Sequence, residues 1–420
     1  MAERTANLFE SKAVFTNEER KVSVYSDTES PTVPDEVTQD TSLEELNLNW
    51  RESDLPEKER TKHVHRLHPY LGKFIPQLVE IFLRKYFRPG QTVLDPFCGS
   101  GTTLVQANEL GINAIGSDIS AFNVLLSRAK VQKYDISGVR KEVLDALDKL
   151  RQLTQTRTQM RLWEERVSEL NIPVTDNEYL RTWYAPKALV ELLTYRYLIE
   201  KEGYLYQDLL KIILSRSARS ARLTTHYDLD FPKRPQREPY WCYKHSRTCS
   251  PTKEAFKFIS RYSLDTLRRV EEFDALRTEA TIEVHHSDSR LAEFPSIDGV
   301  ITSPPYVGLI DYHDQHAYAY HLLGLEDRRD AEIGPAANGS GSEAKRQYQL
   351  DIAQVFRNCV KAMIRGGWLI VVIHDSANLY PEIASMCSVE VMAVLDRHVN
   401  RRTGRRSSEF YESIFIWRKP

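Results

Sequence analysis

Short apolar runs that end in polar residues mark the first strands of a parallel sheet. Thr92–Leu94 ends in Asp95, a glycine-bearing turn and a helical run from Thr102 to Leu110 follow, and Ala114–Ser117 ends in Asp118. Strand, tight turn, helix and second strand, in this order, open a parallel βαβ unit. The sequence therefore predicts an α/β fold.

The same pattern returns in the C-terminal part of the chain. Apolar runs at Thr281–Val284 and Ile297–Thr302 predict strands, and Trp368–Ile373 is apolar throughout, as in a strand buried on both faces. The last runs are Ala393–Leu395 and Ser413–Trp417, and the second of these is predicted to be antiparallel at the end of the sheet. Together the runs predict a seven-stranded, mostly parallel sheet.

Helical spacing of apolar residues predicts further elements. One amphipathic helix is expected at Gln77–Tyr86, and another at Tyr348–Ile364, before a tight turn at Gly366–Gly367. In the middle of the chain, Val139–Leu170 indicates a long charged helix or helix pair, and Leu180–Leu214 indicates more helices with core-type stripes. Residues 136–280 are therefore predicted to be a helical insertion in one catalytic domain, which comprises residues 61–135 and 281–420.

The first sixty residues differ from the rest in composition. They are rich in Glu, Asp, Ser and Thr, and no apolar periodicity lasts. Because such a segment buries little apolar surface, we expect residues 1–60 to be a flexible acidic segment with a short helix near Ser42–Leu48. The alternative is an arm that packs on a second subunit.

The turn after the first strand, DPFCGSGTT, contains Gly99 and Gly101 just before a helix. Glycines let the backbone pass close under a ligand, and the free N–H groups of a helix start favour a polar or anionic group. Asp118, at the end of the second strand, stands where ribose hydroxyls are often held. A glycine-rich turn by itself could serve NAD, FAD or other ligands, but this one departs from GxGxxG.

DPFCGSGTT followed by GSD, together with SPPY at residues 303–306, resembles the amino-methyltransferases of DNA. Members of that family transfer a methyl group from S-adenosylmethionine (AdoMet) to the exocyclic amine of cytosine or adenine. The resemblance covers Leu67–Ile119 and Val284 to roughly Lys419, and it implies a Rossmann-like AdoMet-dependent methyltransferase fold.

The resemblance also implies which residues bind the cofactor. HPYLGKFIP would cover the methionine end of AdoMet, unless it is only a helix cap with a buried aromatic residue. Asp288 matches the acidic position beside the adenine ring, unless it only caps a turn or helix. The predicted cofactor-binding residues are Lys73, Phe74, Asp95, Phe97, Gly99, Gly101, Thr102, Asp118 and Asp288.

The predicted catalytic residues are Ser303, Pro304, Pro305 and Tyr306. An exocyclic amine is a poor nucleophile because its lone pair is delocalised into the ring, and acceptors placed against its N–H bonds favour rehybridisation. Ser303 and the carbonyl of Pro304 are such acceptors, the prolines stiffen the turn, and Tyr306 would stack on the base. The base must leave the duplex to reach them, and transfer is then a direct in-line displacement.

Within the family, a serine in the first position is associated with the N4 amine of cytosine, and aspartate or asparagine more often with the N6 amine of adenine. Ser303 therefore favours cytosine-N4 methylation of double-stranded DNA. The resemblance further implies the modification half of a restriction-modification system, with a possible cognate restriction endonuclease. Adenine-N6 specificity, an RNA base-amine methyltransferase and a DNA-binding module that only senses AdoMet remain alternatives.

The formal net charge of −2 hides an uneven distribution. Residues 1–50 carry eleven acidic and four basic side chains, whereas residues 211–270 carry fourteen basic and five acidic ones. Such a chain can hold a polyanion against one region. No apolar run is long enough to span a membrane, no hydrophobic signal region begins the chain, and five scattered cysteines do not indicate disulfides. We expect a cytoplasmic protein, monomeric or homodimeric.

The basic region is the candidate DNA-recognition surface. Three arginines recur every three residues, as on one face of a helix, and the other cations lie among prolines and aromatic residues, as in a loop on a phosphate backbone. The alternative is a solvated basic face. The predicted DNA-binding residues are Arg216, Arg219, Arg222, Lys233, Arg234, Arg237, Lys244 and Arg247.

The spacing Cys242-x2-His245-x3-Cys249 offers three zinc ligands. No second matching pair follows, and His226 could be a fourth ligand only if the chain folds back. Ordinary packing is therefore the favoured interpretation, and no metal is predicted.

Overall fold

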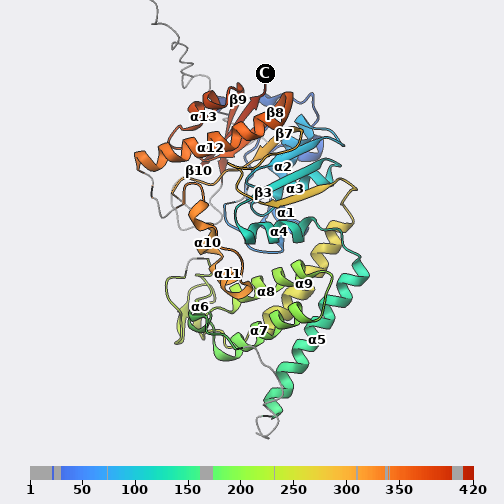
Figure 1. Cartoon of the computed structure of the whole chain (residues 1–420), viewed down its shortest axis with the longest axis vertical. Coiled ribbons are helices and arrows are strands. Elements are labelled where there is room, and N and C mark those ends of the chain that lie inside the picture. Colours follow the sequence, from blue (N-terminus) through green and yellow to red (C-terminus); the bar gives the residue numbers. More distant parts are fainter. Residues whose placement is uncertain are drawn as a thin grey trace, which may run out of the picture.

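An eight-stranded sheet forms the centre of the α/β part of the molecule, in the order β1-β9-β10-β8-β7-β2-β3-β6 (Figure 1). The computed structural model describes residues 21–22, 30–72, 74–160, 174–230, 232–308, 311–335, 339, 341–399 and 410–420. Its strands are β1 (Lys21–Val22), β2 (Thr92–Asp95), β3 (Asn113–Asp118), β6 (Ile282–His286), β7 (Ile297–Thr302), β8 (Met363–Ile373), β9 (Glu390–Val399) and β10 (Phe410–Arg418). Seven of them match the predicted runs, and the two-residue β1 is an addition.

Strand β10 alone runs against its neighbours in this sheet. It pairs antiparallel with both β8 and β9, while the other pairs are parallel. The predicted antiparallel direction is confirmed, but the position at the end of the sheet is wrong. Consecutive antiparallel strands can pair directly, so β10 pairs with β9 and offers its other edge to β8.

Helices cover both faces of the sheet. Neighbouring residues of β2 point to opposite sides, so Val93 belongs to the core under α2 (Pro76–Tyr86), α3 (Thr102–Glu109) and α4 (Ala121–Val131). Leu94 belongs to the second core, under α12 (Ser342–Ala362) and α13 (Tyr380–Cys387). Burial on both faces explains why these strands are continuous apolar runs rather than alternating ones.

The insertion between β3 and β6 is helical, as predicted. It contains α5 (Ile136–Met160), α6 (Glu178–Trp183), α7 (Pro186–Lys201), α8 (Gln207–Ala221), α9 (Phe256–Asp274) and a hairpin of β4 (Tyr240–Cys242) and β5 (Arg247–Cys249). Figure 1 shows these helices as a separate layer below the sheet. The two parts share one hydrophobic core, since buried residues of α7, α8 and α9 cluster with those of α2 and α4.

The N-terminal segment corrects one prediction. Residues 30–60 are not a flexible extension, because Leu46, Leu48 and Trp50 are buried in the main core. The segment contains the short helices η2 (Pro34–Glu36), η3 (Leu43–Glu45) and α1 (Glu57–Arg60), and η4 (His63–Arg66) follows. A short helix was predicted near Ser42–Leu48, and η3 lies there with Ser42 as its N-cap. Apart from Lys21–Val22, the earlier residues, 1–29, lie outside the described residues.

Other element boundaries shift modestly. Helix α12 begins at Ser342, and Gly366 and Gly367 lie within β8, where the pairing with β7 is irregular, rather than in a turn before it. Helices α10 (Tyr312–Gln315) and α11 (Ala317–Leu323) and the turn η6 (Arg329–Ala331) follow β7, and α10 and α11 lie between the sheet and the insertion (Figure 1). Among the described residues, no helix is long and apolar enough to cross a membrane.

Candidate functional site

The two signature turns meet at one edge of the sheet. Strands β2 and β7 are parallel neighbours, with Val93 opposite Gly299 and Leu94 opposite Val300. Their carboxyl ends, Asp95 and Thr302, therefore lie side by side, in the crevice where open α/β sheets bind ligands. The glycine turn continues from Asp95 and SPPY continues from Thr302, so both reach the same place.

A pocket with about 820 Å³ of space not filled by protein atoms opens at this edge. It combines residues of the glycine turn, the end of β3, the segment after β6 and the tetrapeptide. Its lining includes Phe74, Phe97, Gly99, Thr102, Asp118, Asp288, Ser303 and Pro305. The pocket therefore brings predicted cofactor and catalytic groups together outside the strand ends, where open α/β sheets bind ligands.

Asp95 links the glycine turn to the strand end that precedes SPPY. Its carboxylate accepts hydrogen bonds from Thr302 Oγ1 at 2.6 Å, from Thr103 Oγ1 at 2.7 Å and from the Phe97 N–H at 3.2 Å. The side chain is fully buried and does not line the pocket. Direct contact of Asp95 with the cofactor therefore stays a prediction, and its carboxylate links the glycine turn to the residue before Ser303.

Gly99 and Asp118 form the polar floor of the pocket. The Gly99 N–H donates to Asp118 Oδ2 at 2.8 Å, and Oδ1 accepts from the Ser120 N–H at 2.9 Å and from Asn123 Nδ2 at 3.1 Å. Burial raises the pKa of Asp118, and these hydrogen bonds oppose the rise. The carboxylate is thus fixed at the end of β3, with lone pairs left for ligand hydroxyl groups.

The conformation of the turn requires a glycine at position 101. It adopts φ +75° at the start of α3, and a Cβ atom there would come within 2.9 Å of Ser127 Oγ. The residue does not line the pocket, whereas Thr102 beside it does. Of the element before α2, Phe74 is buried and lines the pocket, and Lys73 lies outside the described residues.

Asp288 lines the pocket but is already paired with a cation. The Arg290 guanidinium bonds both of its carboxylate oxygens, with Nη2 to Oδ2 at 2.7 Å and Nε to Oδ1 at 3.0 Å. Burial opposes the charged form of Asp288, but the hydrogen bonds and charge of Arg290 hold its pKa below the usual value. Asp288 is therefore a fixed acceptor at the wall of the pocket.

In the tetrapeptide, Ser303 and Pro305 line the pocket, while Pro304 is buried in the turn. The Pro305 carbonyl accepts from Tyr348 Oη at 2.9 Å. Tyr306 does not line the pocket, and its hydroxyl donates to Glu412 Oε1 at 3.0 Å. Burial raises the pKa of Tyr306 well above its usual value, so the hydroxyl stays protonated.

Sequence analysis missed several residues of the pocket. Tyr70, Asn123, Tyr312 and Glu332 line it, and the ring of Tyr70 stacks on that of Tyr312 with centroids 5.9 Å apart. Tyr70 lies in the HPYLGKFIP segment, in which only Lys73 and Phe74 were predicted to bind the cofactor. Tyr312 and Glu332 come from the segment after SPPY, which has no motif, so only the fold brings them here.

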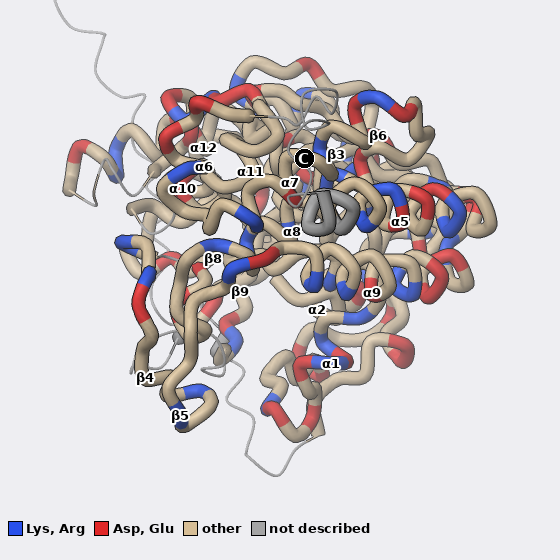
Figure 2. The backbone as a smooth tube through the Cα atoms, turned by 90° about the horizontal axis from the view of Figure 1, so that it is seen from below, with Lys and Arg blue, Asp and Glu red and all other residues tan. Residues whose placement is uncertain are grey.

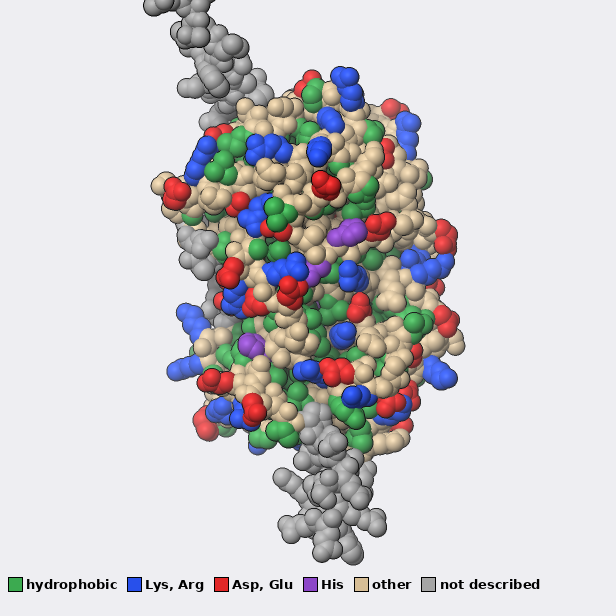
Figure 3. All heavy atoms as spheres, viewed as in Figure 1, with side chains coloured by type: hydrophobic (Ala, Val, Ile, Leu, Met, Phe, Trp, Pro, Cys, Tyr) green, Lys and Arg blue, Asp and Glu red, His purple; other side chains and the backbone are tan. Residues whose placement is uncertain are grey.

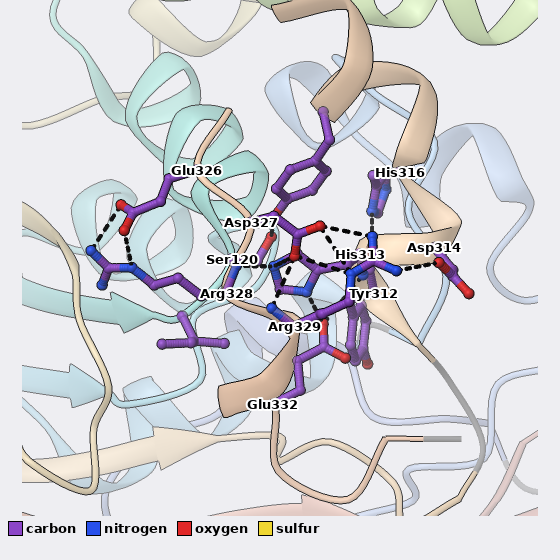
Figure 4. Close-up of polar contacts among 12 residues, drawn as sticks. Ser120, Tyr312, His313, Asp314, His316, Glu326, Asp327, Arg328, Arg329 and Glu332 are labelled. Atoms are coloured by element: carbon purple, nitrogen blue, oxygen red, sulfur yellow. Dashed lines mark hydrogen bonds and ion pairs between the residues drawn. The ribbon is translucent and has the colours of Figure 1, made fainter. Parts of the chain in front are cut away.

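Figure 4 shows the polar contacts within that segment. Buried His313 bonds the Glu332 carboxylate, and burial raises the pKa of Glu332. Arg329 pairs with Asp327 at 2.8 Å and with Asp314 at 3.1 Å, which joins α10 to η6. These contacts fix the wall that carries Tyr312 and Glu332.

The predicted arginine stripe does not face solvent. Arg216 pairs with Asp265 at 2.7 Å and covers the Tyr262 ring, with its guanidinium carbon 4.1 Å from the ring centroid. Arg219 pairs with Asp230, and Arg222 is buried against the Tyr318 ring and donates to the Leu229 carbonyl. The expected basic surface on α8 is therefore wrong, because these cations are used to pack the insertion.

The remaining predicted cations lie at the surface. Arg237 donates to the Thr182 carbonyl at 3.1 Å and is otherwise exposed. The other exposed cations of this set are Lys233, Arg234, Lys244 and Arg247. The hairpin β4–β5 projects at the edge of the molecule in Figure 2, whereas basic and acidic side chains are interspersed on the face shown in Figure 3.

Comparisons with known proteins agree with this site. A family model described as DNA methylase matches residues 2–128, and one described as D12 class N6 adenine-specific DNA methyltransferase matches residues 72–210. The chain is 37% identical to the type II methyltransferase M.MjaII of Methanocaldococcus jannaschii, over 86% of this chain and 81% of that protein. It is 25% identical to the type II methyltransferase M.BsoBI of Geobacillus stearothermophilus, over 66% of this chain and 56% of that one.

A solved structure, the rRNA methyltransferase AviRa of Streptomyces viridochromogenes, aligns with 84% of this chain and 88% of its own at 13% identity and a TM-score of 0.31. The sheet order and the pocket define the class: the protein has the fold of an AdoMet-dependent methyltransferase, and AdoMet is its cofactor. Within that class, the extent and identity of the M.MjaII match show that the chain belongs to the DNA methylase family, among the type II methyltransferases.

Proposed function

We propose that this enzyme transfers the methyl group of AdoMet to the N4 amine of a cytosine in duplex DNA. The observation that carries the proposal is the position of Ser303, which lines the same pocket as Gly99 and Asp118. A donor held by the glycine turn and an acceptor amine held by the tetrapeptide would thus share one pocket.

The residues of the pocket suit the donor. Asp118 offers a fixed carboxylate for ribose hydroxyl groups, and Phe97 and Phe74 add apolar walls. When bound, AdoMet supplies an electrophilic methyl group on a positively charged sulfur. The protein supplies position and partial negative charge close to that methyl group, which are the contributions that matter most in a direct displacement.

Ser303 acts on the amine. Its hydroxyl oxygen and the Pro304 carbonyl can accept hydrogen bonds from the two N–H bonds of a flipped base, which favours the rehybridised nucleophile. The tie from Asp95 to Thr302 keeps this turn next to the glycine turn. The hydroxyl of Tyr306 is held by Glu412, which supports the turn.

The choice of cytosine rests on the serine that opens the tetrapeptide. The match to the D12 class of adenine-specific enzymes favours the second candidate, adenine-N6 methylation. That match ends at residue 210, before the tetrapeptide, so it concerns the cofactor half of the site. Cytosine-N4 methylation therefore remains the first proposal.

The insertion, residues 136–280, is proposed to contact the DNA target through its exposed cations, with AdoMet bound in the sheet domain. Such an enzyme would protect host DNA from a cognate restriction endonuclease. The arrangement separates target reading from chemistry, as expected for an enzyme that must flip one base out of a defined duplex sequence.

Nucleoside analysis tests the proposal. Purified protein is incubated with duplex DNA of mixed sequence and AdoMet labelled in the methyl group, and the DNA is digested to nucleosides and separated by mass. We expect label in N4-methyldeoxycytidine and no label in a parallel tRNA reaction. Label in N6-methyldeoxyadenosine would establish the second candidate, and label only in tRNA would refute both.

A further inference from the structure

Four potential metal ligands converge at the base of the β4–β5 hairpin. The side chains of His226, Cys242, His245 and Cys249 place one ligand atom each within 4.8 Å of all the others. His226 comes from the loop after α8, and it reaches the hairpin because its backbone N–H donates to Tyr240 Oη at 2.9 Å. The chain thus folds back in the way that a fourth ligand requires, and the prediction of ordinary packing without metal is revised.

The distances between ligand atoms match a tetrahedral site. Cys242 Sγ lies 3.7 Å from His226 Nδ1 and 3.6 Å from His245 Nδ1, and Cys249 Sγ lies 3.5 Å from His245 Nδ1. With Zn–S near 2.3 Å and Zn–N near 2.0–2.1 Å, tetrahedral angles place sulfur and nitrogen about 3.6 Å apart. The observed separations therefore leave room for one ion between the four atoms.

We propose that these four residues hold a structural zinc ion. Two thiolates and two neutral imidazoles are a common ligand set for Zn²⁺, and four protein ligands leave no open position for catalysis. The two thiolate charges balance the charge of the ion, so the occupied site is neutral overall. It can therefore sit beside Lys244 and Arg247 without adding negative charge to this basic region.

The hairpin buries few side chains of its own. Its strands have three residues each, and a two-stranded hairpin is marginal in water. Within residues 225–230 and 232–250, the only buried side chains are those of Cys242 and Cys249. Small units without a core of their own are usually held by disulfides or a metal, and both of these cysteines are free.

A second cluster shows what a non-metal arrangement looks like. His63, His65 and Glu109 also gather within 4.8 Å, but the Lys62 ammonium lies 2.7 Å from the Glu109 carboxylate. The carboxylate is already neutralised there, and a further cation would be repelled. No lysine or arginine is paired with the ligand atoms of the hairpin cluster within the described residues.

The ion would fix the shape of a surface that bears on DNA. Between its ligands the hairpin exposes Trp241, Tyr243, Lys244 and Arg247, and the hairpin stands out from the body in Figure 2. Exposed cations with aromatic neighbours suit contact with a nucleic-acid backbone and bases. This consequence rests on the proposed function, whereas the metal site does not.

Metal analysis of the intact wild-type protein tests the site without any variant. The untagged full chain is produced in zinc-supplemented medium, purified without chelator and analysed by plasma mass spectrometry and zinc X-ray absorption. We expect about one zinc per chain, with two sulfur neighbours at about 2.3 Å and two nitrogen neighbours at about 2.0–2.1 Å. Iron, or zinc far below one equivalent, would refute the proposal.

Variants then locate the ion. Cys249→Ser and His226→Asn should each retain on the order of tenfold less zinc, while Cys387→Ser, at a buried cysteine elsewhere, should retain as much as the wild type. Trypsin cleavage after Lys244 should accelerate in the two ligand variants, and AdoMet binding should not change. Equal zinc content in all three variants would show that the ion is bound elsewhere. Because AdoMet binding is measured separately, the zinc proposal can fail without the proposed function failing.

Discussion

At the scale of single residues, Asp95 connects the two signature turns. Its buried carboxylate ties Thr302, which precedes Ser303, to the turn that contains Gly99. The motif marked Asp95 as important, but its role depends on a partner more than two hundred residues away in the sequence. A pattern within one segment cannot reveal such a partner, so the sequence did not predict this link.

The acid–base behaviour of Asp95 gives the first prediction. Burial raises its pKa from 3.8 to about 6. Between these two pH values the folded chain binds a proton at Asp95 that the unfolded chain does not bind. The free energy of unfolding of the wild type therefore decreases as the pH rises through this window. Asp95→Asn does not titrate, so its free energy of unfolding relative to the wild type should increase by up to about 3 kcal/mol between about pH 4 and 6.5.

Urea unfolding of both proteins at several pH values measures this difference. The substitution also weakens hydrogen bonds that the carboxylate accepts from Thr302 and Thr103, which lowers stability by a constant amount at every pH. The relevant quantity is thus the slope of the difference with pH. Parallel curves for the two proteins would show that Asp95 keeps an ordinary pKa in the folded state.

At the scale of elements, the basic region separates into two groups in different environments. The arginines of α8 are paired within the insertion, whereas the cations of the β4–β5 hairpin are exposed. Their spacing in the sequence predicted a common helical face correctly, since residues 216, 219 and 222 do follow one side of α8 and its C-cap. Periodicity does not show which face of a helix meets solvent. This face of α8 is covered because its acidic partners, Asp230 and Asp265, come from other elements.

DNA affinity should follow this division. Lys244→Ala and Arg247→Ala should each weaken binding to DNA of any sequence and reduce the slope of log K against log salt by about 1 for each phosphate that is no longer neutralised. Lys361→Ala, an exposed cation on α12, is the matched control and should leave both values unchanged. Fluorescence anisotropy at several salt concentrations provides the measurement, and equal effects of all three substitutions would indicate only a general loss of charge.

At the scale of the whole molecule, sheet and insertion form one body that the N-terminal segment completes. The strands and most helices were predictable, because burial on both faces of a parallel sheet produces long apolar runs. The packing of residues 30–60 was not, because their few apolar residues are spaced irregularly and the segment finds partners on α2, far away in the sequence. The position of β10 within the sheet also could not be predicted from the order of strands along the chain, because it depends on pairing with both β8 and β9.

The N-terminal segment should therefore contribute to global stability. Leu46 is 1% exposed, so Leu46→Ala should lower the free energy of unfolding by about 2–5 kcal/mol, as for other buried leucines. Val33, in the same segment, is 48% exposed, and Val33→Ala should change stability by no more than about 0.5 kcal/mol. Chemical unfolding of the two variants decides the matter, and similar small losses would mean that the segment detaches without cost.

The central claim is that the glycine turn and the tetrapeptide serve one pocket with separate duties. The most direct measurement compares single-turnover methyl transfer to DNA by the wild type and by Ser303→Ala, with AdoMet affinity determined in parallel. The account predicts that transfer slows by about 100- to 1,000-fold, as when one preorganised hydrogen-bonding group is removed, while AdoMet affinity stays within a few-fold of the wild type. Transfer at the wild-type rate, or an equal loss of transfer and AdoMet binding, would contradict it.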